Sequence, residues 1–262
     1  MKSEREKFLN QFYTEKCDED TRLSSKHGAV EFITTTTYIH KYLKPNDRIL
    51  EVGAGTGVYS LYFAEKGFKV NAIEYVQRNI DILKEKIKEE MDVVAEQGDA
   101  LDLSRFADDT FDVTLVLGPL YHLYTKEDVD EAIREAIRVT KKEGIIALAY
   151  LTHDSIMLDY VLFKNHLIDG YLKDFDEKFK MTVNPENIFS AFYIEEFKKM
   201  MEKYDITYLH NLATDGMAHH LKEKIDSLTE EEFKVWMRYH LASCEREDLQ
   251  GYSNHMLYIC KK

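Results

Sequence analysis

The stretch ILEVGAGTG, residues 49–57, is the part of this 262-residue chain whose residue types most directly indicate a chemistry. A short apolar run leads into Gly53, Gly55 and Gly57, and a helix-forming run follows. Glycines at these positions let a ligand lie against bare backbone, and they accept the positive φ angles of a tight turn. We therefore expect a binding loop at the carboxyl end of a strand, where open α/β sheets bind their ligands.

The spacing of these glycines favours one kind of ligand. A dinucleotide fingerprint, G-x-G-x-x-G, would place its third glycine where this chain has Val58. The loop also begins beside Glu51, an anion that is poorly placed for a pyrophosphate and well placed for an ammonium group. S-adenosylmethionine carries an ammonium and a sulfonium and no phosphate, so the loop suits this ligand better than NAD.

Two further carboxylates stand where strands are expected to end. Glu74 ends the run VNAIE, where it can accept hydrogen bonds from both hydroxyls of a ribose. Asp99, in the segment GDA, follows the next run and can accept from an adenine amino group. Taken singly, these residues also fit a solvated strand end and a helix cap, but their order along the chain favours one shared cofactor site.

The segment LGPLYHLY, residues 117–124, is expected beside the reacting group, at the end of another strand. Pro119 restricts the backbone there. His122 is the candidate general base because an imidazole titrates near neutral pH, and Tyr121 is a candidate pocket wall or catalytic acid. A histidine bonded to nearby backbone is an equally good interpretation of His122, and a base is needed only if the acceptor loses a proton.

The other histidines suggest less. His153 and Asp154 form a possible site pair, for which a helix start capped by Asp154 is the alternative. His219, His220 and His255 have no familiar metal-ligand spacing, so no metal is expected.

Hydrophobic periodicity predicts the elements that position these residues. Strands are expected at 47–52, 68–74, 93–99, 111–118 and 144–151, with helices at 58–65, 77–90 and 126–139. This alternation is typical of a mostly parallel sheet covered by helices on both faces, an α/β fold. Outside it we expect helices at 2–16 and 26–43, a largely helical segment 152–203 that ends in a helix at 192–204, strands at 206–212 and 255–260, and helices at 216–226 and 229–246.

The ordered motifs EVGAGTG, Glu74, GDA and FDVTLVLG resemble those of class I S-adenosylmethionine-dependent methyltransferases of the small-molecule type. The resemblance covers residues 47–151. It implies a Rossmann-like sheet of seven strands in the order 3-2-1-4-5-7-6 with the last strand antiparallel, S-adenosylmethionine as methyl donor and S-adenosylhomocysteine as product. Together with the loop chemistry, it gives these cofactor-binding candidates: Glu51, Gly53, Ala54, Gly55, Gly57, Glu74, Tyr75, Asp99, Ala100, Leu117 and Gly118.

The segment 117–124 is also partly similar to the Asn/Asp-Pro-Pro-Tyr motif of amino-group methyltransferases that act on nucleic acids. Here Leu117, Gly118 and Leu120 stand in that motif, and the amide or carboxylate that would bind a planar amine is missing. We therefore do not expect that activity.

The resemblance also suggests a division of the chain. Residues 1–45 would form a helical lid, 46–151 the cofactor-binding core, 152–203 a helical insertion or second lid, and 204–262 the part that completes the sheet. Additions of this kind fold over the cofactor in related enzymes and select the acceptor. The lid and substrate candidates are Tyr13, Arg22, His27 and His153, and simple packing of helices against the sheet is the alternative.

Composition limits the partners. The chain has 48 acidic and 35 basic residues and a net charge of −13, which argues against routine binding of nucleic acid. The beginning MKSEREKFLNQFY lacks the apolar core of a signal peptide, and no apolar run approaches the ~20 residues that span a bilayer. The three scattered cysteines suit a reducing cytosol.

The prediction is therefore a cytoplasmic methyltransferase with a small-molecule acceptor. The alternatives are an S-adenosylmethionine-binding sensor or scaffold without transferase activity, a nucleotide-dependent oxidoreductase, and a protein or RNA methyltransferase.

Overall fold

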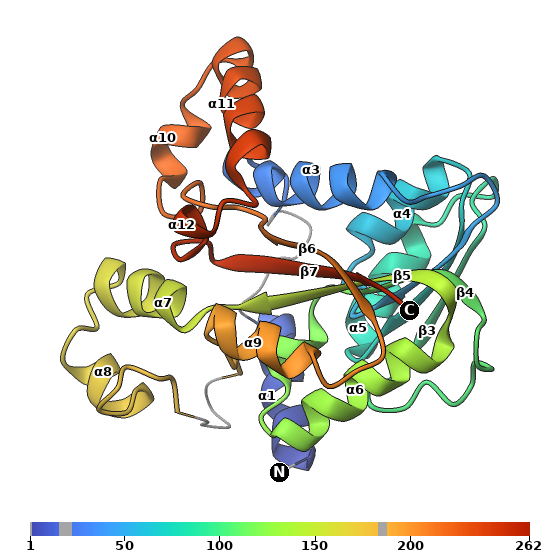
Figure 1. The fold of residues 1–262 in the computed structure, drawn as a ribbon, viewed down its shortest axis with the longest axis horizontal. Coiled ribbons are helices and arrows are strands. Elements are labelled where there is room, and N and C mark those ends of the chain that lie inside the picture. The colour runs from blue at the N-terminus through green and yellow to red at the C-terminus, as the bar shows by residue number, and fades with distance from the viewer. Residues whose placement is uncertain (1, 16–22, 183–187) are drawn as a thin grey trace.

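A seven-stranded sheet forms the centre of the computed structural model, which describes residues 2–15, 23–182 and 188–262 (Figure 1). The strand order is β3-β2-β1-β4-β5-β7-β6, and β1 to β5 are parallel while β7 runs antiparallel to both of its neighbours. The strands are β1 (Arg48–Val52), β2 (Lys69–Glu74), β3 (Val93–Gln97), β4 (Phe111–Val116), β5 (Thr140–Leu151), β6 (Thr207–Ala213) and β7 (His255–Lys261). The predicted fold class and strand order are confirmed.

Helices cover both faces of this sheet because its central strands are apolar on both sides. In β5, Ile145, Ala147 and Ala149 pack on one face, against α3 (Lys26–His40) and α4 (Val58–Glu65). The alternate residues of β5 pack on the other face, against α6 (Lys126–Val139) and α9 (Ile194–Met201). Figure 1 shows these two helical layers with the sheet between them.

The helices begin and end at local signals. The side chain of Thr125 accepts a hydrogen bond from the backbone N–H of Asp128 and so caps α6. The remaining helical elements are α1 (Lys2–Glu15), α5 (Gln77–Lys86), the 3-10 helix η1 (Pro119–His122), α7 (His153–Ile156), the π-helix η2 (Met157–Phe163), α8 (Asp169–Asp174), α10 (Lys222–Asp226), α11 (Glu230–Ser243) and α12 (Glu247–Gln250). Within the described residues, every helix is too short or too polar to cross a membrane.

The segment 152–203 is less helical than its sequence predicts. After α8 the chain turns back on itself, and Phe175 pairs with Met181 in an isolated β-bridge. The side chain of Asp176 accepts hydrogen bonds from the backbone N–H groups of Lys178 and Lys180. These local bonds offer the backbone an alternative to helical pairing. The predicted helix at 216–226 is also shorter, since Gly216 has a φ of 52° and regular helix begins only at Lys222.

Candidate functional site

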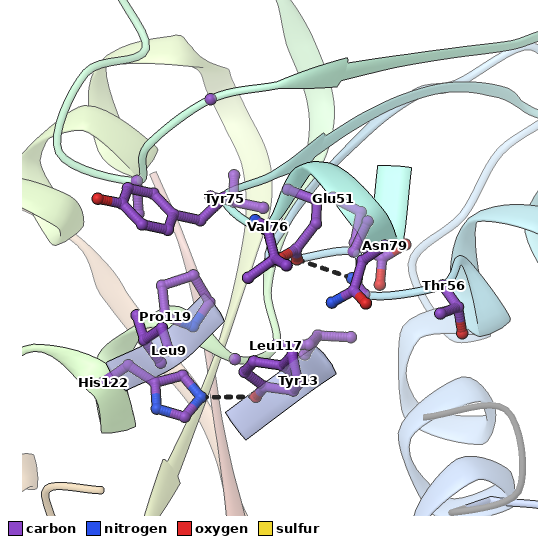
Figure 2. Close-up of a pocket in the computed structure, with 18 of the residues that line it drawn as sticks. Leu9, Tyr13, Glu51, Thr56, Tyr75, Val76, Asn79, Leu117, Pro119 and His122 are labelled. Carbon is purple, nitrogen blue, oxygen red and sulfur yellow. Dashed lines mark hydrogen bonds between the residues drawn. The ribbon is translucent and has the colours of Figure 1, made fainter. Parts of the chain in front are cut away.

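A cavity that is partly open to solvent, with about 830 Å³ of empty space, lies at the carboxyl ends of β1 to β4 (Figure 2). Most of its wall comes from the ends of these strands and the segments that follow them, and α1 and Leu23 also contribute. The cofactor-binding candidates that line it are Glu51, Gly53, Ala54, Gly55, Glu74, Tyr75, Asp99, Ala100, Leu117 and Gly118. The strand order reverses between β1 and β4, so the cavity lies where open α/β sheets bind ligands.

The glycine loop has the backbone shape that its sequence requires. Gly53, Gly55 and Gly57 have φ angles of 80°, 53° and 92°, in the left-handed region that disfavours other residues. A Cβ atom on Gly53 would lie 2.5 Å from Cδ of Pro119. Gly57 does not line the cavity; it starts α4, and a Cβ atom on it would lie 2.1 Å from Cδ1 of Leu83. Its role in this structure is therefore to let the loop pack against α5.

Glu74 holds the loop from the next strand. One carboxylate oxygen accepts a hydrogen bond from the backbone N–H of Gly55 at 2.9 Å, and the other accepts from Val76 N–H at 2.8 Å. The residue is 7% exposed and lines the cavity. Each oxygen of a carboxylate has two lone pairs, so both can accept a second hydrogen bond from a ligand.

Burial strongly perturbs the carboxyl group of Glu51. It is 2% exposed and accepts a hydrogen bond from the Ser60 hydroxyl. Burial raises the pKa of the Glu51 carboxyl to about 8; the bonds from Ser60 oppose this shift, and the nearby Glu74 carboxylate adds to it. In the ligand-free protein Glu51 is therefore mostly protonated at neutral pH, and a cationic group in the cavity would favour its ionised form.

The far end of the cavity joins Asp99 to α1. The guanidinium of Arg5 lies 3.4 Å from Asp99 Oδ1, which also accepts a hydrogen bond from Leu101 N–H at 3.1 Å. The same guanidinium lies over the ring of Tyr75, 5.0 Å from its centroid. Asn79 also lines this cavity, and its buried side-chain nitrogen has no hydrogen-bond partner among the described residues. These residues form a polar wall at this end of the cavity.

Both ring nitrogens of His122 are engaged, and Figure 2 shows one of these contacts, that of Nε2 with the Tyr13 hydroxyl. Nδ1 lies 2.8 Å from the carbonyl oxygen of Ile188, which can only accept, so this nitrogen carries the proton. Nε2 therefore accepts from the Tyr13 hydroxyl, at 2.7 Å. Burial lowers the pKa of His122 to about 4, so the ring is neutral at physiological pH. The hydroxyl of Tyr121 donates to the carbonyl of Leu117 at 3.1 Å, and its ring lines the cavity.

The lid candidates fall in different places. Tyr13 lines the cavity, whereas His27 bonds to Asp226 at 2.7 Å and is not among the described lining residues. Arg22 lies outside the described residues. His153 is buried, accepts from Met181 N–H at 3.2 Å and lines a separate cavity. The cap of α7 is Thr152, so the interpretation of Asp154 as a cap is wrong.

Sequence reasoning missed several lining residues, among them Arg5, Leu9, Thr56, Tyr59, Val76 and Asn79. Asn79 carried a usable signal. It lies in the first turn of α5, beside the core position Ile80, and helices of an α/β sheet begin at the ligand-binding edge. Arg5 and Leu9 carried no such signal, because only the docking of α1 on the sheet edge brings them to the cavity.

Comparison with known proteins gives a consistent result. Residues 50–148 match the model of a family described as a methyltransferase domain. Over 112 residues the chain is 34% identical to the putative methyltransferase YqeM of Bacillus subtilis, covering 42% of this chain and 45% of that protein. Over 110 residues it is 34% identical to a demethylmenaquinone methyltransferase of Renibacterium salmoninarum, covering 42% of this chain and 43% of that protein. The matches thus span less than half the length of these relatives.

A solved structure extends the likeness over most of the chain. A S-adenosylmethionine-dependent methyltransferase from Methanosarcina mazei covers 86% of this chain and 96% of its own, with a TM-score of 0.58 and 18% identity. At that identity the match shows a shared fold. The family match assigns residues 50–148 to a methyltransferase domain, and the strand order is the one that the resemblance to class I S-adenosylmethionine-dependent methyltransferases predicts.

Proposed function

We propose that this chain transfers a methyl group from S-adenosylmethionine to a small-molecule acceptor and releases S-adenosylhomocysteine. The observation that carries the proposal is the cavity bounded by the glycine loop, in which Glu51, Glu74 and Asp99 come from the ends of three neighbouring strands. This set suits a cationic, phosphate-free adenosyl compound. A pyrophosphate would face buried carboxylic groups, which disfavours the oxidoreductase alternative.

The proposed cofactor pose follows from these side chains. The methionine ammonium would pair with Glu51, and the ribose hydroxyls would donate to the carboxylate of Glu74. Adenine would lie between Tyr75 and Ala100, with Asp99 and the buried amide of Asn79 as its polar partners. The sulfonium would then face Leu117 and Gly118, and the exposed backbone of Gly53 and Gly55 would let the cofactor approach closely.

Methyl transfer is an in-line displacement, so much of the rate can come from holding acceptor and methyl group in line. The contacts of His122 support a positioning role more than that of a base. Its Nε2 already accepts from Tyr13, and its low pKa makes it a weak proton acceptor at pH 7. We infer that His122 holds the Tyr13 hydroxyl over the cavity; an acceptor proton could reach Nε2 only through that hydroxyl.

The two helical additions act as lids in this proposal. The division into 1–45, 46–151, 152–203 and 204–262 is supported by Arg5, Leu9 and Tyr13 of α1, which line the cavity. The second addition supplies the Ile188 carbonyl that orients His122 and the Phe189 ring that packs on it at 5.3 Å. Both additions would therefore order the reaction edge when a ligand binds.

A small-molecule acceptor is supported by the aromatic wall of the cavity, the acidic charge of the chain, and the printed names of relatives such as demethylmenaquinone methyltransferase. A cytoplasmic location is supported by the buried free thiols of Cys244 and Cys260.

Calorimetry with the full chain tests the cofactor. We expect S-adenosylmethionine to bind and NAD not to bind. Glu74→Gln should weaken binding about 10-fold or more, as expected for loss of a charge-assisted hydrogen bond. Glu96→Gln, which changes an exposed carboxylate on the neighbouring strand, is the matched control and should bind as the wild type does. Tighter binding of NAD, or equal effects of the two variants, would overturn the cofactor assignment.

Product analysis tests the transfer itself. Incubation with methyl-labelled S-adenosylmethionine and a broad panel of small amines, phenols, thiols and carboxylic acids should give S-adenosylhomocysteine together with a labelled small molecule. Cofactor binding without turnover over that panel would favour the sensor or scaffold. Label in protein or RNA instead would show that the acceptor is macromolecular.

A further inference from the structure

Three side chains that no part of the proposed mechanism uses converge on one point beside the cavity. They are Glu31 on α3, Asp215 in the turn after β6 and His255 at the start of β7. Nδ1 of His255 lies 2.9 Å from Asp215 Oδ2 and 3.3 Å from Glu31 Oε2. The three ligand atoms all lie within 4.8 Å of one another.

The cluster is held deep in the protein. The side chains of Asp215, Glu31 and His255 are 4%, 13% and 15% exposed. Two carboxylates that are so little hydrated cost free energy unless positive charge lies close to them. Both face the same nitrogen, and an imidazole nitrogen carries at most one hydrogen. One N–H can point along a straight line to only one of these oxygens, whereas a cation between the three groups would contact both carboxylates.

Asp215 is oriented as a ligand carboxylate would be. Its Oδ1 accepts hydrogen bonds from the Ser253 hydroxyl at 2.7 Å, Asn254 N–H at 2.9 Å and His255 N–H at 3.2 Å. These three donors come from one turn and fix the carboxylate plane. The other oxygen, Oδ2, lies 2.9 Å from Nδ1 of His255 and also accepts from His255 N–H at 3.3 Å. Hydrogen bonds of this kind orient the first ligands of protein metal sites.

The distances also fit a coordinated ion. Donor atoms about 2.0–2.2 Å from one cation lie roughly 3 Å apart from each other when they occupy adjacent coordination positions. The imidazole nitrogen has that spacing to each of the two carboxylate oxygens, and the two oxygens lie within 4.8 Å of each other. Imidazole suits zinc, and carboxylate oxygens suit both manganese and zinc.

We propose that Glu31, Asp215 and His255 bind one divalent cation of the Mn²⁺ or Zn²⁺ type, with its remaining coordination positions open to water or to an acceptor oxygen. The position of the cluster supports contact with an acceptor oxygen, since the centroid of the His255 ring lies 6.0 Å from that of the Tyr121 ring, which lines the cavity. The site departs from the expectation that no metal is bound. Its ligands come from three elements that only the fold brings together, so no spacing in the sequence indicates it.

The test uses the full chain without S-adenosylmethionine, so its outcome is independent of the proposed methyl transfer. Protein stripped with EDTA and dialysed is titrated separately with MnCl₂ and ZnCl₂ in a calorimeter. We expect one ion per chain for at least one of the two metals. Glu31→Gln and His255→Gln should each weaken binding about 10-fold or more.

The matched control is His27→Gln. His27 also has its Nδ1 against a carboxylate, 2.7 Å from Asp226, but without the second acid of the cluster. This variant should bind metal as the wild type does. Absence of stoichiometric binding of both metals, or equal affinity in His255→Gln and His27→Gln, would overturn the proposal.

A second measurement covers the case in which a cluster variant does not fold. Paramagnetic Mn²⁺ added to the wild-type chain should broaden the NMR signals of the His255 ring at substoichiometric amounts and leave those of His27 sharp. Equal broadening of both rings, or broadening of neither together with unchanged His255 ring signals on addition of ZnCl₂, would also overturn the proposal.

Discussion

Binding of S-adenosylmethionine should release a proton from this protein, because Glu51 is protonated in the ligand-free cavity. Burial raises the pKa of Glu51 to about 8. At pH 7 the carboxyl is then about 0.9 protonated. If the ligand ammonium pairs with it, its pKa falls toward the ordinary value, and binding at pH 7 releases about 0.9 proton.

The same reasoning sets the pH dependence of the affinity. Between pH 5.5 and 7 the α-ammonium of the ligand stays charged, since such groups titrate at about 7.7–8.0. Glu51 must lose its proton before it can pair. The affinity should therefore rise roughly tenfold for each pH unit over this range. His122 does not interfere, because burial holds its pKa at about 4, below this range.

Calorimetry in two buffers of different ionisation enthalpy measures both quantities. The wild type should show a binding enthalpy that depends on the buffer, and Glu51→Gln should show none of this dependence and a flat pH profile. A wild type that binds without proton release, or a variant that still releases the proton, would refute the placement of the ammonium beside Glu51.

Further predictions concern the glycine loop, stability and the first lid. In the ligand-free wild type, the raised pKa of Glu51 should lower the free energy of unfolding as pH rises from about 4.5 to about 8, by on the order of a few kcal/mol. Chemical denaturation of Glu51→Gln should give an unfolding free energy that depends less on pH. In urea unfolding, Gly57→Ala should destabilise the protein by roughly 1–3 kcal/mol more than Gly67→Ala. Both glycines have strongly positive φ, but only a Cβ atom on residue 57 would meet Leu83. Equal losses of stability would show that the backbone conformation alone sets the penalty. Hydrogen exchange should slow in α1 when S-adenosylmethionine binds and stay unchanged in α6, and equal protection of α1 in both states would contradict the lid.

The sequence predicts the core well because the core is built from local regularities. The strand–helix alternation over 46–151 is visible as a change of hydrophobic period, and α4 and α6 begin and end at the predicted residues. The ends of parallel strands lie at one edge of the sheet, so residues that follow strands are brought together once the order is known. This is why Glu51, Glu74 and Asp99 could be assigned to one cavity before any contact between them was seen.

Contacts between elements that are distant in the sequence produce no comparable local pattern. Tyr13 and His122 are 109 positions apart, and their hydrogen bond depends on how α1 docks. The hydrophobic period of a helix predicts which of its faces is buried, but it does not predict which other element packs against that face. The same holds for the segment 175–182, where the side-chain bonds of Asp176 compete with helical pairing that the local composition favours.

The three carboxylates of the cavity show what burial adds to a motif. In the sequence they are alike, each an acid after a strand. In the fold, Glu74 is held by two backbone N–H groups, Asp99 faces Arg5, and Glu51 is buried against Ser60, whose hydroxyl donates to it. The protein therefore has one carboxylate that shapes the loop, one that anchors the lid and one whose charge depends on the ligand. A cationic ligand would favour the ionised form of Glu51. Because Glu51 must then lose its proton, proton release on binding is the most direct measure of what this cavity binds.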